Sequence, residues 1–111
     1  MTILLVEPGK PPQKTEIPNN LQSMQDTVGG LIQAVYPFED PIALVCHEEG
    51  KLLGLPWNRS LFHPETGNLY DIICGTFFLC SAPPDSAEFE SLNDDQIARY
   101  SAYFGGGDHL G

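Results

Sequence analysis

The segment 69–80 constrains the fold more than any other part of the chain, because it is apolar on both faces of a two-residue period. In a strand, side chains alternate between the two faces of the sheet. One face of this segment would carry Tyr70, Ile72, Cys74 and Phe78, and the other Ile73, Phe77 and Leu79. A strand that is covered on both faces lies at the centre of a sheet. Gly75 within the segment predicts a bulge or a close approach of the backbone to another group.

Shorter elements are predicted before this central strand. Apolar runs that end at Pro, Gly or acidic residues predict strands at 3–6, 13–17, 31–36, 42–47 and 52–55, with a turn at 48–51 before the last. Asn19 is the expected cap of a first helix, with Gln22 three residues later as in a capping box and Gly29 at its end. The apolar stripe of this helix would consist of Leu21, Met24 and Val28.

A second helix has the clearest local signal in the sequence. Asn93 is the expected cap, Gln96 stands three residues later, and Leu92 is placed to pack on Ile97 as a hydrophobic staple. Three apolar side chains share one face of this helix: Ile97, Tyr100 and Phe104.

These elements predict one α+β domain over residues 1–111. Its core would be a mostly antiparallel sheet of five or six strands with the two helices packed against it. The glycines at 105–107 are expected to end the second helix and to begin a flexible tail over 105–111.

The charge of the chain excludes several kinds of partner. Fifteen acidic residues against five basic ones give a formal net charge of −10, which repels nucleic acid and anionic membranes. No apolar run approaches the roughly 18 to 20 residues of a membrane span, and the first residues lack an export signal, so we expect a cytoplasmic protein. Acidic residues are dense from Asp85 onward, as either a solvated face or a partner surface.

Metal and thiol chemistry find little support in the sequence. The three cysteines are odd in number and form no Cys-x-x-Cys pair, which predicts reduced core thiols. Cys46 and His47 are adjacent on an expected strand, so their side chains point to opposite faces and do not share an ion. Cys74 is the best-placed nucleophile, but its apolar neighbours disfavour the thiolate. We therefore expect no cofactor, no metal and no catalytic residue.

The group of Trp57, Asn58 and Arg59 is the strongest candidate for a binding site, and it follows the expected strand 52–55 directly. Arg offers a planar fork of donors for phosphate or carboxylate, Asn both donates and accepts, and Trp supplies a stacking face. Asp71 and Gly75, on the central strand, are the expected neighbours of this group. The alternative is structural: Arg59 pairs with Asp71 or caps a carbonyl group, while Trp57 fills the edge of the core.

Several blocks of sequence carry a resemblance that covers nearly the whole chain. They are residues 3–12, 28–32, 48–59, 70–78 and 92–97. In these blocks the chain resembles a domain-of-unknown-function family (DUF3846-like) carried by bacterial phages and conjugative elements. The resemblance implies a mobile-element setting, in which small accessory proteins often counter host defence, and it implies no catalytic residue.

Two functions compete in that setting. In the first, the protein is not an enzyme and sequesters a nucleotide-type small-molecule signal in a pocket lined by Trp57, Asn58, Arg59, Asp71 and Gly75, with a homo-oligomer enclosing the ligand. In the second, its acidic surface imitates DNA, or serves as an interaction module, and inhibits a host DNA-binding or defence protein. A nucleotide-processing enzyme with Asp71 as base and Arg59 as phosphate clamp is a third hypothesis.

Overall fold

The computed structural model describes residues 1–105, which form seven strands and two helices. In chain order these are β1 (Thr2–Val6), β2 (Gln13–Glu16), α1 (Leu21–Val28), β3 (Ile32–Val35), β4 (Ile42–His47), β5 (Trp57–Phe62), β6 (Leu69–Cys74), β7 (Phe77–Ser81) and α2 (Asp94–Gly105). Five strands make an antiparallel sheet in the order β2-β1-β7-β4-β3, and β5 and β6 pair as a separate antiparallel sheet. The predicted α+β class is confirmed, with the strands divided between two sheets.

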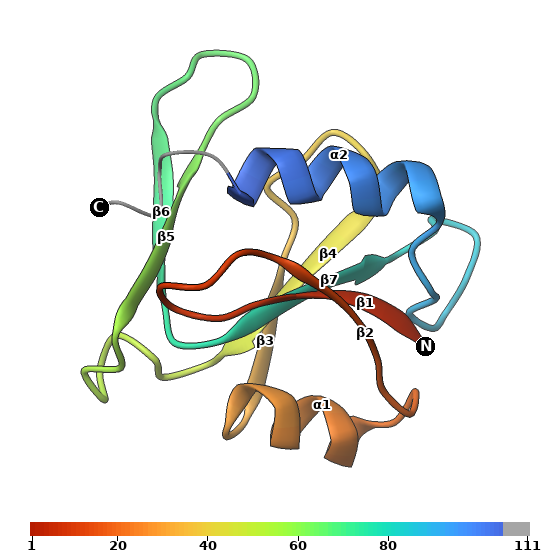
Figure 1. The fold of residues 1–111 in the computed structure, drawn as a ribbon, viewed down its shortest axis with the longest axis horizontal. Helices are drawn as coiled ribbons and strands as arrows, with labels where there is room; N and C mark the ends of the chain where they lie inside the picture. Colours follow the sequence, from red (N-terminus) through yellow and green to blue (C-terminus); the bar gives the residue numbers. More distant parts are fainter. Residues whose placement is uncertain (106–111) are drawn as a thin grey trace.

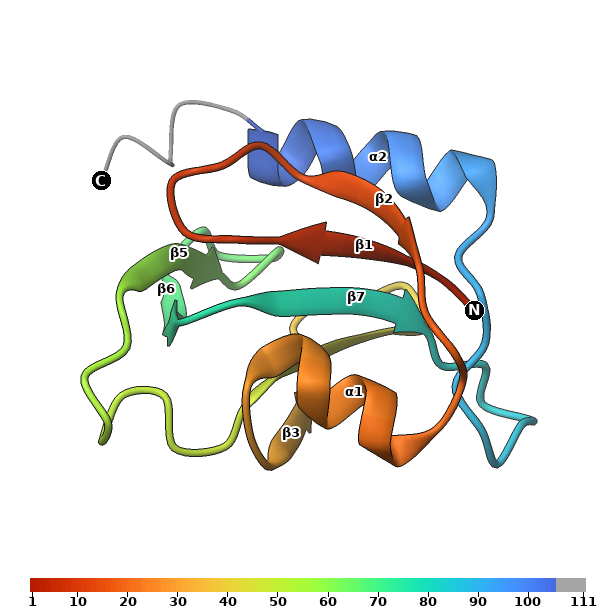
Figure 2. The same ribbon diagram turned by 60° about the horizontal axis from the view of Figure 1, so that its bottom comes forward.

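The five-stranded sheet lies between the two helices, with α2 over one face and α1 over the other (Figure 1). The β5-β6 hairpin stands beside the end of the sheet at which β1 ends and β7 begins, and both views agree on this arrangement (Figure 2). Within residues 1–105, neither helix is long and apolar enough to cross a membrane.

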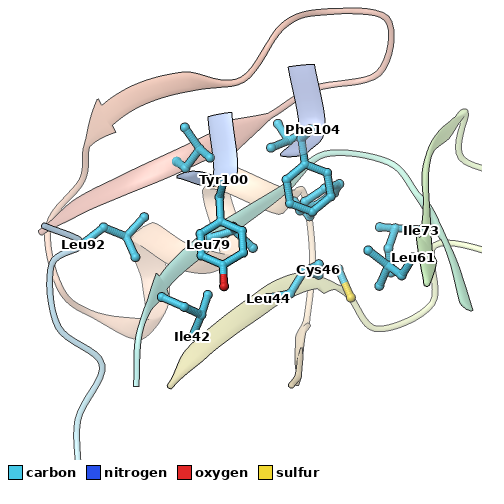
Figure 3. Close-up of a cluster of buried hydrophobic side chains, with 12 residues drawn as sticks. Ile42, Leu44, Cys46, Leu61, Ile73, Leu79, Leu92, Tyr100 and Phe104 are labelled. Carbon is cyan, nitrogen blue, oxygen red and sulfur yellow. The ribbon is translucent and has the colours of Figure 1, made fainter. Parts of the chain in front are cut away.

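Apolar side chains from the sheet, α2 and the hairpin meet in the larger of two clusters formed by residues 1–105 (Figure 3). Its buried members are Leu4, Val6, Ile42, Leu44, Cys46, Leu61, Ile73, Phe77, Leu79, Leu92, Tyr100 and Phe104. The cluster on the α1 side contains Ile3, Met24, Val28, Ala43, Val45, Phe78 and Cys80. Strands β1, β4 and β7 therefore supply alternate residues to both clusters. Leu61 and Ile73 are the buried side chains by which the hairpin joins the core, and each contributes roughly 1.5–3 kcal/mol by its burial.

The segment 69–80 is two strands rather than one. Its second half, in β7, is the central strand of the five-stranded sheet and is buried on both faces, as the sequence predicts. Its first half, β6, pairs with β5 in the other sheet, so the prediction of one continuous strand is wrong. The chain changes sheet at Gly75, whose φ of 86° is unfavourable for other residues. A Cβ at Gly75 would also lie 2.8 Å from Cδ1 of Leu55.

The predicted strand at 52–55 is a series of turns instead. The N–H of Leu53 donates to the carbonyl of Glu49 (2.9 Å), and the N–H of Leu55 donates to that of Gly50 (3.0 Å). Leu52 is 85% exposed, because no sheet covers this segment. Strand β5 begins only after Pro56, so Trp57, Asn58 and Arg59 lie within a strand rather than after one.

Helix α1 begins one residue later than predicted. Its cap is Asn20, whose side-chain oxygen accepts from the N–H of Ser23, whereas the Asn19 side chain donates to the carbonyl of Phe89 (2.9 Å). Leu21 is 58% exposed and was wrongly placed in the apolar stripe; the buried members are Met24 and Val28. The helix ends at Gly29 as predicted, in the left-handed conformation (φ 88°).

Helix α2 confirms the capping box. The N–H of Asn93 donates to Oε1 of Gln96 (2.9 Å), and the N–H of Gln96 donates back to Oδ1 of Asn93 (2.8 Å). Tyr100 and Phe104 are buried and Ile97 packs against the same cluster, as expected. Gly105 is the last residue of the helix; the rest of the tail predicted at 105–111 lies outside the described residues.

Candidate functional site

A β-bulge turns two consecutive polar side chains into the interior at the start of β5. Trp57 pairs with Cys74 and Arg59 pairs with Ile73, so Asn58 is the extra residue between them. Without the bulge, Asn58 and Arg59 would face opposite sides of the hairpin. Both are fully buried here, and Trp57 is half-buried.

Asn58 connects the hairpin to the five-stranded sheet. Its Nδ2 donates to the carbonyl of Val6 at the end of β1 (2.9 Å) and to that of Gly75 between β6 and β7 (2.8 Å). Val6 is the last residue of β1, and Gly75 lies between β6 and β7, so both carbonyls are at the ends of strands. The side chain therefore fixes the position at which the hairpin meets the sheet, and its amide protons are used in doing so.

Arg59 connects the hairpin to α2. Its Nε donates to the carbonyl of Phe104 (3.1 Å), in the last turn of the helix, and its Nη2 to the carbonyl of Lys10 (2.8 Å), between β1 and β2. Nη1 donates to the backbone carbonyl and to Oδ1 of Asn58 (3.0 and 2.9 Å). A guanidinium at the C-terminus of a helix satisfies carbonyl groups that have no partner within the helix. Of the two structural alternatives for Arg59, the structure therefore shows the carbonyl cap.

Asp71 lies apart from these two buried side chains. Its carboxylate forms an ion pair with Nζ of Lys51, and Oδ1 also accepts from the N–H of Ile72 (2.8 Å). The hydrogen bond to Asp71 raises the pKa of the Lys51 ammonium. Both side chains are partly exposed, so the pair is a modest source of stability. Asp71 and Lys51 stand in the wall of a cavity.

This cavity has a volume of about 340 Å³ and lies between β6, the β3-β4 pair and the turn after β4. It is lined by Gln33, Val35, Cys46, His47, Glu48, Glu49, Gly50, Lys51, Leu52, Asp71, Ile72, Ile73 and Cys74. Of the predicted site residues, only Asp71 is among these. The structure thus separates the five: Asp71 lines the cavity, Asn58 and Arg59 are enclosed in the interior, Trp57 is half-buried in β5, and Gly75 is at the change of sheet.

The residues of the cavity wall carry both hydrogen-bond donors and hydrogen-bond acceptors. The lining residues include Glu48, Glu49 and Asp71, which carry carboxylates, Lys51, which carries an ammonium group, and Gln33, which carries an amide. His47 is a lining residue, but its ring lies toward the α1 side of the sheet, because His47 pairs with Ile32, which packs on that side, and a Cβ on Gly30 would lie 2.4 Å from Nε2 of His47. Its Nδ1 accepts from the N–H of Glu49 (3.0 Å), which leaves the proton of the neutral ring on Nε2. Within residues 1–105, no group of three or more His, Cys, Asp and Glu side chains is arranged to hold a metal ion.

The family of the chain follows from a comparison with models of known protein families. The model of a domain of unknown function, DUF3846, matches residues 1–105, which contain all the strands and helices of the described fold. The chain belongs to the DUF3846 family. No significant match was found among curated proteins or solved structures.

Two of the three cysteines of this DUF3846 domain are buried. Burial raises the pKa of the Cys46 thiol to about 11 and that of the Cys80 thiol to about 12. At neutral pH both are therefore protonated and poor nucleophiles. Cys74 is half-buried and lines the cavity, as Cys46 does.

The sequence does not reveal the part that the turn after β4 plays in forming the cavity. Glu48, Glu49 and Lys51 look like the solvated residues of a hairpin turn. In the DUF3846 fold this turn packs on the end of β6, so closely that a Cβ on Gly50 would lie 2.6 Å from the carbonyl oxygen of Cys74. The glycine between the charged residues was the available signal, because it marks a close backbone approach.

A second polar cluster joins the β3-β4 connection to α2. The hydroxyl of Tyr100 donates to Oδ2 of Asp40 (2.7 Å), and Arg99 forms an ion pair with the same carboxylate. The hydrogen bond from Tyr100, together with the charge and hydrogen bond of Arg99, lowers the pKa of Asp40 in spite of some desolvation. Burial and the bond to Asp40 raise the pKa of Tyr100. In this DUF3846 domain the cluster holds α2 against the β3-β4 connection at the edge of the core.

Proposed function

We propose that the protein is a non-enzymatic binding protein that holds a small molecule in the cavity beside Asp71. The observation that supports this is the cavity itself, with its volume of about 340 Å³ and charged side chains of both signs in its wall. Small-molecule sites commonly have volumes of roughly 300–1,000 Å³ and a few convergent polar groups. In this proposal a phage or conjugative element encodes the protein, and the protein acts in the cytoplasm of the bacterial host.

The wall indicates the chemistry of the ligand. Three carboxylates, from Glu48, Glu49 and Asp71, accept hydrogen bonds and favour a ligand edge that carries N–H groups. The amide of Gln33 both donates and accepts, as the edge of a nucleobase requires. Among the lining residues within 1–105, Lys51 alone supplies a positive charge, so the ligand carries at most one anionic group that Lys51 neutralises.

A nucleotide-type signal with little negative charge meets these requirements. Its base would donate to the carboxylates and its single phosphate would contact Lys51. Arg59, the phosphate clamp expected from sequence, is buried and donates to the carbonyls of Phe104 and Lys10, so Lys51 takes that role in the proposal. Nucleoside triphosphates would be repelled by the surplus of carboxylates.

Binding without turnover would make the protein a sequestering agent. The buried Cys46 thiol is protonated at neutral pH, and the Asp71 carboxylate is held by Lys51 and by the N–H of Ile72. Neither group is therefore positioned as a free nucleophile or base. We propose that the protein counters host defence by lowering the free concentration of the signal.

Titration calorimetry with nucleosides, cyclic mononucleotides and nucleoside triphosphates tests the proposal. Uncharged and singly charged ligands should release heat, and triphosphates should not. Asp71→Asn and Lys51→Ala should each weaken binding about tenfold, the effect of one charged hydrogen bond. Lys14→Ala is the matched control, because Lys14 is an exposed lysine of β2 that faces Asp94 across 3.9 Å.

Native mass spectrometry of protein purified from its host supplies an independent measurement. A bound mass that is lost in the Asp71→Asn variant supports the proposal. Ligand-free protein together with no heat from any of the three ligand classes refutes it. Conversion of a ligand to product during a long incubation would show that the protein is an enzyme and would contradict binding without turnover.

The charge of −10 favours a second candidate, in which the acidic surface occupies a DNA-binding protein. Asp94, at the start of α2, has a side chain that is 99% exposed, and Asp95 follows it. This candidate predicts that the protein displaces duplex DNA from a host DNA-binding protein, and that raising the salt concentration abolishes the displacement. Asp94→Asn with Asp95→Asn should weaken the displacement without affecting ligand heats in calorimetry.

A further inference from the structure

The two outer strands of the five-stranded sheet differ in how well they are protected. An exposed strand edge is a template for pairing with another chain, and proteins commonly block it with charged residues or proline. The outer strand β2 carries Lys14 and Glu16 and is preceded by Pro12. The outer strand β3, with the residues on either side of it, reads Leu-Ile-Gln-Ala-Val-Tyr over 31–36, with neither a charge nor a proline.

The hydrogen-bonding groups on the outer side of β3 follow from its register with β4. The carbonyl of Leu31 accepts from the N–H of Glu48 (2.8 Å), so this pair is hydrogen-bonded. In an antiparallel ladder, hydrogen-bonded and non-bonded pairs alternate. Gln33 and Val35 therefore bond to β4, while the N–H and C=O groups of Ile32 and Ala34 point away from it. Within residues 1–105, no strand pairs with β3 on that side.

The side chains of β3 link this edge to the acidic cavity. Gln33 and Val35 face the cavity, and Ile32 packs on the α1 side of the sheet. A strand added to β3 would have the same alternation, with every second side chain on the cavity side. Leu31 and Tyr36, each 57% exposed, stand at the two ends of the edge and offer apolar contact.

We propose that the outer edge of β3 binds an extended, basic segment of a partner protein as a sixth strand of the sheet. Its backbone would pair with Ile32 and Ala34, and alternate Lys or Arg side chains would reach the carboxylates of Glu48, Glu49 and Asp71. A net charge of −10 on the chain makes a basic segment the complementary occupant and disfavours a second copy of the same chain. This interaction goes beyond the proposed small-molecule role, because it requires backbone pairing along β3, which a small molecule does not make.

Three synthetic peptides of about eight residues, the length of an ordinary strand, test the proposal. The first alternates Arg and Val, the second has the same sequence with N-methyl groups along one edge, and the third alternates Glu and Val. Binding is followed by NMR, through amide shifts and hydrogen exchange in the protein. The Arg/Val peptide should slow exchange at Ile32 and Ala34, because their N–H groups would become bonded.

Two variants with the same change of residue and charge locate the interaction. Gln33→Lys, on β3, should weaken binding of the Arg/Val peptide about threefold, the effect of a like charge on a neighbouring strand. Gln13→Lys, on the exposed β2 strand, should leave the affinity unchanged. Circular dichroism confirms that both variants are folded before the affinities are compared.

The results of these experiments distinguish a paired basic strand from association by charge alone and from a second copy of the chain. Slowed exchange at Ile32 and Ala34 with the Arg/Val peptide, and with neither of the others, supports the proposal. Equal binding of the N-methylated peptide would mean that charge alone drives the association and would overturn it. So would shifts that map to β2, or no slowing at about 1 mM peptide, a concentration that detects even weak binding. A dimer in sedimentation that Gln33→Lys dissociates would assign the edge to a second copy instead. Asp71→Asn removes one of the three carboxylates but leaves the backbone of β3 intact, so the Arg/Val peptide should bind this variant more weakly and still slow exchange at Ile32 and Ala34, even where small-molecule heat is lost.

Discussion

Replacing Arg59 by Met tests whether this residue is a structural connector. Met has a similar reach but donates no hydrogen bond, so the substitution removes the bonds from Nη1 to the neighbouring Asn58 and also the two long-range bonds to the carbonyls of Phe104 and Lys10. Each hydrogen bond from a charged donor contributes about 1.5–3 kcal/mol, which gives about 3–6 kcal/mol for the two. The desolvation of a fully buried guanidinium opposes this sum and is relieved in the variant. We expect a net loss of about 2–4 kcal/mol in the free energy of unfolding, a large share of the total for a small domain.

Urea unfolding followed by circular dichroism measures this loss by linear extrapolation. The matched control is Arg99→Met, because Arg99 is 60% exposed in its ion pair with Asp40 and its replacement should cost much less stability than that of Arg59. For a domain of about this size, the Arg59 variant should also melt roughly 8–16 °C lower than the wild type. A loss below about 1 kcal/mol for Arg59→Met would refute the connector role and make the guanidinium available for a ligand.

Three further outcomes are expected. Gly75→Ala should destabilise the protein by about 2–3 kcal/mol in urea unfolding, because φ is positive and the added Cβ meets a side chain. Gly9→Ala, with positive φ but open space around it, should cost only about 1 kcal/mol, and equal losses would contradict the close approach at Gly75. Cys80, whose thiol has a pKa of about 12, should resist iodoacetamide at pH 8 until urea unfolds the chain, as mass spectrometry would record. The hydrogen bond from Tyr100 holds the folded-state pKa of Asp40 below its usual 3.8, so the stability it contributes is present above about pH 4 and is lost as the pH falls through the folded-state pKa. Asp40→Asn should flatten the fall of the urea midpoint in that acidic range, and an unchanged pH profile would contradict the linkage.

The parts of the fold that the sequence predicted well depend on local interactions. The capping box of α2 is one example, because Asn93 and Gln96 bond to each other's backbone and need no distant partner. Strand β7 is another, because burial on both faces leaves few other positions for so apolar a strand. The cap of α1 was misplaced by one residue because Asn19 and Asn20 are both suitable, and the choice depends on the distant carbonyl of Phe89.

The parts that were mispredicted depend on contacts between distant segments. Alternating apolar residues continue across Gly75, so the change of sheet is visible only in its backbone conformation. Likewise, a two-residue period puts Asn58 and Arg59 on opposite faces, and only the bulge in β5 turns both inward. At the candidate site, Asp71 is the one predicted residue that lines the cavity. The charged turn beside it could not be placed, because its packing on β6 is a tertiary contact.

The position of β7 in the sheet has a consequence for how the chain folds. On one side of it lie β1 and β2, and on the other lie β3 and β4; each of these pairs joins strands that are consecutive in the chain. The two pairs can form early, but they share no ladder until β7 has been synthesised and inserted between them. Closing such distant pairings is the slow part of building a sheet. During synthesis on the ribosome, one edge of the apolar strand β4 therefore stays unpaired until β7, some thirty residues later in the chain, has been made. The nascent chain is most exposed to aggregation in that interval.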